Sequence, residues 1–133
     1  MALALGYAWM KGFPAIPSSP HPRIAKAIGG TDARTYVYSR GGFIDWEYLW
    51  RIDAEPTVIE EVIQALELRK SVTIPAQFWK MPPYYWPRSL SPEMKAFRSL
   101  NFSDDTRGAD GAHFFLLHDP EKKRAYVWFR DNF

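Results

Sequence analysis

Residues 43–53 alternate between large apolar side chains and mostly charged ones, which is the pattern of a half-buried β-strand. The apolar positions are Ile44, Trp46, Tyr48, Trp50 and Ile52. Successive side chains of a strand point to opposite faces, so this stripe lies on one face. Residues 35–39 are rich in β-forming types, and Gly41 and Gly42 suit a turn. The sequence therefore predicts a hairpin whose aromatic stripe is the buried face of a sheet.

Residues 56–67 have the spacing of an amphipathic helix. Pro56 suits a first helical turn, and apolar residues then recur every three or four positions. These positions are Val58, Ile59, Val62, Ile63 and Leu66. Glu60 and Glu61 lie between them and face away. We expect a helix of about three turns that packs on the sheet.

A second hairpin is predicted at residues 113–118 and 125–129, on either side of a polar turn that contains Pro120. Both arms are apolar on both faces, so both faces must be covered. We expect the helix on one face and the aromatic, proline-rich residues 77–88 on the other. The predicted fold class is α+β: a mostly antiparallel sheet of about four strands in hairpin-helix-hairpin order, with one main helix packed on a face and one or two short helices.

The smaller elements follow from local signals. A short helix is expected to be capped by Ser19 and to stop at Gly29, and a second is expected to begin at Ser91. The inward positions of the second helix are Met94, Phe97 and Leu100. Residues 71–74 are predicted to form a short strand, and residues 101–111 a loop.

Residues 1–18 are expected to lie outside the domain, as an apolar leader followed by a proline-rich tether; residues 19–133 are expected to form a single domain. Residues 1–10 are too short to cross a bilayer, which takes about 20 residues. They are either an element of the domain or the end of a truncated membrane anchor. The sequence leaves both readings open, and with them a cytoplasmic or a membrane-associated location.

Composition excludes several classes of site. The chain has no cysteine, so it has no disulfide, thiolate metal site or thiol nucleophile. A net charge of +2 is too small to indicate nucleic-acid binding by itself. The acids of residues 103–112 do not follow the register of a calcium loop, so no metal and no cofactor are predicted.

Residues 77–88 combine aromatic rings, prolines and cations in a mixture that fits neither a regular helix nor a strand. Such a segment either caps a core or meets a partner. The candidate partner-binding residues are Trp79, Lys80, Tyr84, Tyr85, Trp86 and Arg88. Aromatic residues make up 17% of the chain, more than a core of this size is expected to absorb, so at least two of the four Trp and Tyr rings are predicted to be accessible.

The function favoured by these features is a non-catalytic interaction or assembly module with a protein partner, held at a membrane if residues 1–10 are an anchor. Two alternatives remain. One is single-stranded nucleic-acid binding, by aromatic stacking and basic residues. The other is a small enzyme with a histidine and carboxylate site, for which His21, His113 and His118 are the candidates. His113 and His118 are expected on opposite faces of one strand, and the chain contains no known nucleophile, phosphate-binding or zinc motif.

Overall fold

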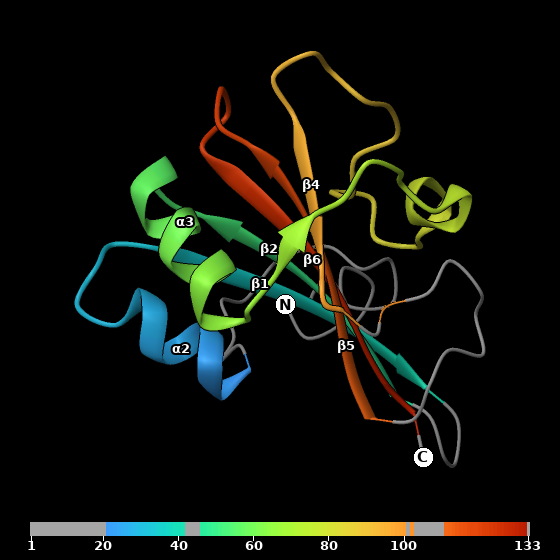
Figure 1. Ribbon diagram of the computed structural model, residues 1–133, viewed down its shortest axis with the longest axis horizontal. Helices are drawn as coiled ribbons and strands as arrows, with labels where there is room; N and C mark the ends of the chain where they lie inside the picture. The colour runs from blue at the N-terminus through green and yellow to red at the C-terminus, as the bar shows by residue number, and fades with distance from the viewer. Residues whose placement is uncertain (1–20, 42–45, 101, 103–110, 133) are drawn as a thin grey trace, which may run out of the picture.

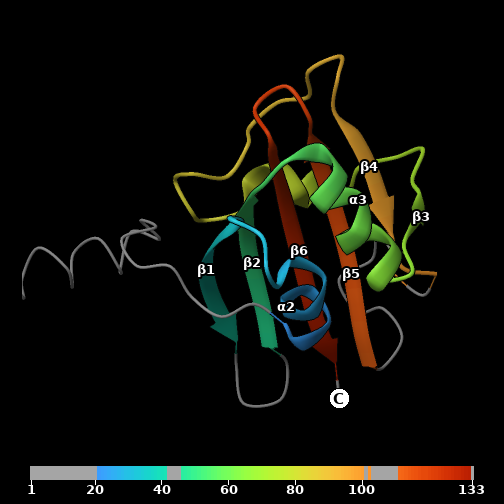
Figure 2. The same cartoon turned by 90° about the vertical axis from the view of Figure 1, so that its left-hand side faces the viewer.

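In the computed structural model, the residues described are 21–41, 46–100, 102 and 111–132. They form one antiparallel sheet in the order β1-β2-β6-β5-β4-β3 (Figures 1 and 2). The strands are β1 (Arg34–Gly41), β2 (Trp46–Asp53), β3 (Arg69–Lys70), β4 (Lys95–Arg98), β5 (Gly111–Asp119) and β6 (Arg124–Asn132). The helices are α2 (Pro22–Ile28), α3 (Pro56–Ala65) and the 3₁₀-helix η1 (Ala76–Lys80). The predicted leader and tether, residues 1–18, lie outside the described residues, as do Gly42 and most of the predicted loop. The prediction that Ser19 caps the first helix is wrong: α2 begins at Pro22, and its N-cap is His21.

The predicted four-stranded sheet with one main helix is wrong. The sheet has six strands, and two short helices, α2 and α3, lie on one of its faces (Figure 2). The segment at residues 56–67 does form a helix, but α3 has only 10 residues and shares its face with α2. Among the described residues, no helix is long and apolar enough to span a membrane.

The additional strands arise where the sequence predicted other elements. Residues 95–98 form β4 instead of the helix expected from Ser91, and Leu100, expected inward, is 77% exposed. Short isolated helices are marginal in water, whereas β4 satisfies the free edge of the buried strand β5. Residues 71–74 are not a strand; the pairing with β4 is made just before them, by Arg69 and Lys70.

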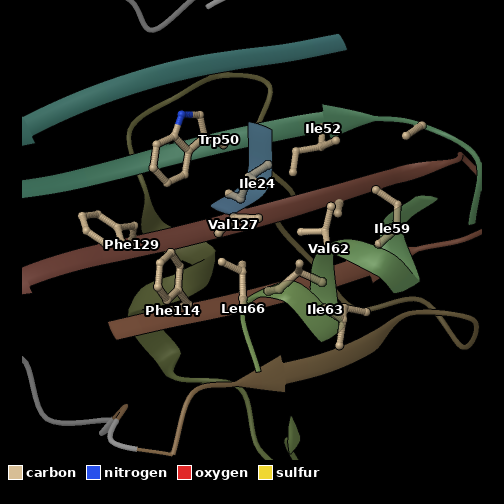
Figure 3. Close-up of a cluster of buried hydrophobic side chains, with 13 residues drawn as sticks. Ile24, Trp50, Ile52, Ile59, Val62, Ile63, Leu66, Phe114, Val127 and Phe129 are labelled. Atoms are coloured by element: carbon tan, nitrogen blue, oxygen red, sulfur yellow. The ribbon is translucent and has the colours of Figure 1, made fainter. Parts of the chain in front are cut away.

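Each face of the sheet carries its own core. The helix-side core joins β2, β5 and β6 to α2 and α3 (Figure 3). Its buried members include Ile24, Trp50, Ile52, Ile59, Val62, Leu66, Phe114, Val127 and Phe129. The lid-side core, on the opposite face, includes Leu49, Phe78, Met81, Trp86, Phe115, Leu117, Tyr126 and Trp128. The prediction that a helix and the aromatic, proline-rich segment cover opposite faces of the second hairpin is therefore confirmed.

Candidate functional site

Residues 76–88, here called the lid, begin with η1 and fold over the lid-side core (Figure 1). Trp86 is only 2% exposed, and its indole N–H donates to the carbonyl oxygen of Phe78 at 2.7 Å. Tyr85 is 8% exposed, and its hydroxyl donates to the carbonyl oxygen of Leu49 in β2 at 3.1 Å. Burial raises the pKa of Tyr85, so it stays a neutral donor. Tyr85 thus bonds the lid to β2, whereas Trp86 bonds one part of the lid to another and packs its ring against Tyr126 of β6 at 5.5 Å.

Arg88 holds the lid in its irregular shape. Its guanidinium donates to the carbonyl oxygens of Trp79 at 3.1 Å, Met81 at 2.6 Å and Pro83 at 3.1 Å. These carbonyls lie where prolines and the end of η1 prevent a regular backbone ladder. The planar fork of an arginine reaches several acceptors at once. Although Arg88 is exposed, its hydrogen bonds are therefore directed into the lid.

Replacing Arg88 with alanine is expected to lower the free energy of unfolding by about 1–2 kcal/mol, because lid carbonyls lose a charged donor. Arg88→Lys should restore less than half of this loss, since a single ammonium cannot span the same acceptors. Urea denaturation followed by tryptophan fluorescence measures both values. Lys80 is an exposed cation of the same lid, so Lys80→Ala is the matched control. Equal losses of stability for Arg88→Ala and Lys80→Ala would contradict this role.

The outer surface of the lid is formed by the remaining candidates. Tyr84 is 56% exposed, Lys80 is exposed, and Trp79 is half-buried, with its ring edge-to-face against Phe78 at 5.3 Å. The structure thus leaves one of the four predicted rings clearly exposed and a second partly so. Exposed aromatic residues of this kind are typical of protein-contact surfaces.

Tyr84 lies at one end of a row of neighbouring side chains that extends to β1. Its ring stacks beside Tyr85 at 6.3 Å, and the guanidinium of Arg51 lies 5.9 Å from the Tyr85 ring and 5.0 Å from the Tyr36 ring. Asp53 fixes Arg51 through two hydrogen bonds, of 2.9 and 2.7 Å. We call Tyr36, Arg51, Tyr85 and Tyr84 the tyrosine row.

Sequence reasoning missed Tyr36 and Arg51. They lie opposite each other in the β1–β2 register, so the hairpin pairing was the signal that could have found them.

The two edges of the sheet differ strongly. β3 is two residues long, and both of its side chains are exposed cations. β1 is eight residues long and pairs only with β2 among the strands described. Its central residues, 36–39, contain neither a charge nor a proline. Exposed edges are usually shortened or charged to prevent further pairing; β3 has both of these features, whereas the centre of β1 has neither.

The histidines named for catalysis are not brought together. His113 and His118 are both buried, on opposite faces of β5, as their spacing predicted. Burial lowers the pKa of His118, which favours its neutral form. Within the parts of the chain that are described, no three His, Asp or Glu side chains are grouped as metal ligands.

Comparison with protein-family models, with curated proteins and with solved structures gives no match for this chain.

Proposed function

We propose that this chain is a non-catalytic protein-interaction module that takes up an extended segment of a partner protein along β1. The observation that carries the proposal is the centre of β1, which has no charge or proline and pairs only with β2 among the described strands, beside the tyrosine row. An extended peptide that joins a sheet edge gains main-chain hydrogen bonds, and its alternate side chains supply the specificity.

On the lid side, the alternate side chains of such a segment would meet Tyr36, Tyr38 and Tyr84. Tyr38 packs against the lid-side core and, like Tyr36, is partly exposed. The row is held in place before a partner arrives, because Asp53 fixes Arg51 and the hydroxyl of Tyr85 is bonded to β2. Little side-chain freedom is lost on binding, which favours affinity.

The partner chemistry follows from the same residues. The accepted segment should be extended, free of proline and rich in β-branched or aromatic residues at alternate positions, because it faces an uncharged strand and a row of rings. Arg88 directs its hydrogen bonds into the lid carbonyls. That bonding favours a peptide over a nucleic-acid backbone, because it occupies donors that could otherwise bind phosphates.

Selection of linear peptides from a random displayed library on the immobilised protein tests the proposal. Selected peptides are expected to lack proline and to shift the backbone amide resonances of residues 36–39 in ¹H–¹⁵N spectra. Tyr36→Ala and Tyr84→Ala should each raise Kd about tenfold, the effect of losing a central aromatic contact. Leu90→Ala, which removes an exposed apolar side chain outside the row, is the matched control and should change Kd less than twofold.

Binding that leaves residues 36–39 unperturbed, or that survives both tyrosine substitutions, would contradict strand addition at β1. Single-stranded oligothymidine provides a second arm. Retention of the oligonucleotide at low salt that disappears as salt rises would identify phosphate binding and would overturn the proposal in favour of nucleic acid.

A further inference from the structure

The helix-side face holds a hollow of about 320 Å³, partly open to solvent, between the start of α2 and the strands β1, β2 and β6. Its lining includes His21, Val37, Ser39, Tyr48, Trp50 and Phe129. Small-molecule sites are concave, mostly apolar and of at least about this size, with a few polar groups that fix orientation. The hollow lies on the face opposite the lid, so it is separate from the tyrosine row.

Aromatic rings build most of its wall. Tyr48 and Trp50 are stacked, with centroids 5.4 Å apart and planes 6° from parallel, and each lies 5.8 Å from Phe129. The ring of His21 is 5.5 Å from Phe129. Figure 3 shows Trp50 and Phe129 projecting from neighbouring strands on the same side of the sheet. Such a wall matches another flat ring, because aromatic groups gain from stacked and edge contacts.

One polar group in this wall lacks a partner. The indole N–H of Trp50 is buried and makes no hydrogen bond to any of the described residues, and the whole residue is 4% exposed. Figure 3 shows its nitrogen on the ring edge nearest β1, the strand that contributes Val37 and Ser39 to the hollow. A buried donor without an acceptor is unfavourable, so a ligand that supplies the acceptor is favoured because the bond it forms removes this penalty.

His21 adds a second donor. Its Nδ1 accepts the backbone N–H of Arg23 at 3.2 Å, so the neutral ring carries its proton on Nε2. Burial lowers the pKa of His21, which favours that neutral form. The described lining contains no Asp, Glu, Lys or Arg side chain. The described lining residues therefore present neutral donors and rings, and none of them carries a charge that could pair with an ion.

We propose that this hollow binds a small neutral compound that has one or two flat rings and a carbonyl-type acceptor, with the acceptor on the indole N–H of Trp50. An apolar cavity of about 150 Å³ holds a benzene molecule, so the volume here suits one ring with substituents or a fused pair. This inference goes beyond the proposed docking of a partner strand and does not depend on it.

Titration of the full chain with acetophenone, followed through the tryptophan indole resonances in ¹H–¹⁵N spectra, tests the inference. The Trp50 resonance, assigned by its loss in Trp50→Phe, should move downfield and saturate. Trp128 is the internal reference, because its indole N–H is also buried without a hydrogen bond to any described residue but it does not line the hollow, so its resonance should stay in place. Toluene, which has the ring without the acceptor, should not move the Trp50 resonance downfield.

Three substitutions make the result specific. Trp50→Phe should raise Kd for acetophenone about three- to tenfold, the effect of one hydrogen bond, whereas Trp128→Phe should leave it unchanged. Ser39→Phe places a ring in the mouth of the hollow from an exposed strand position and should abolish binding while the fold is retained. Three results would each overturn the proposal. The shifts do not saturate, the shifts at Trp50 and Trp128 are equal, or neither probe binds because the chain's own residues fill the hollow.

Discussion

Replacing Trp86 with alanine is expected to lower the free energy of unfolding by about 3–5 kcal/mol, the range for removing a fully packed aromatic side chain. Trp86 fills the centre of the lid-side core, with ring centroids 5.0 Å from Phe78 and 5.5 Å from Tyr126. The substitution also removes the donor to the Phe78 carbonyl. Urea denaturation monitored by circular dichroism measures the loss.

The conservative substitution Trp86→Phe separates the two contributions. It keeps most of the ring contacts and loses the hydrogen bond, so we expect a cost of about 1–2 kcal/mol. A loss below about 1 kcal/mol for Trp86→Ala would mean that the lid is not part of the cooperative fold, since surface substitutions usually fall within about 0.5 kcal/mol.

Replacing Ile59 with alanine is expected to cost about 2–5 kcal/mol from the opposite face of the sheet. Ile59 is completely buried in the helix-side core, in the second turn of α3. Alanine is the better helix former, but that gain is only a few tenths of a kcal/mol, so the cavity dominates. The same denaturation experiment applies.

Val58→Ala is the matched comparison for Ile59. Val58 is the adjacent position of α3 and only partly buried against the same core, so its truncation should cost about 1 kcal/mol or less. Similar losses at the two positions would show that α3 does not pack in the orientation described.

The long, regular patterns predicted their elements well, and the short ones did not. The alternation in residues 43–53 and the spacing in residues 56–67 identified β2 and the segment of α3, because each repeats several times. β4 has four residues, among which Phe97 happens to lie three positions from Met94 and from Leu100. Its strand conformation is decided by pairing with β5, which local spacing does not encode.

The candidate site shows a similar division. Composition alone singled out the lid, but an irregular backbone has no period, so nothing in the sequence shows that Trp86 turns inward while Tyr84 turns outward. The contribution of Tyr36 depends on Arg51 lying across the hairpin and on the lid reaching both. Such a site is assembled from the two arms of one hairpin and from the lid further along the chain, and only the tertiary structure brings the lid to the hairpin.

The position of β6 determines how late in synthesis the sheet can form. Among the described strands, β6 is the last to be synthesised, yet it lies between β2 and β5 in the sheet. Until residues 124–132 emerge, the β1–β2 hairpin has no neighbour on its inner side, and a lone hairpin is at best marginally stable in water. The apolar surface of β2, which includes Trp50 and Ile52, therefore stays exposed while more than half of the chain is translated. This order of synthesis leaves apolar surface open to non-native association until the sheet can form.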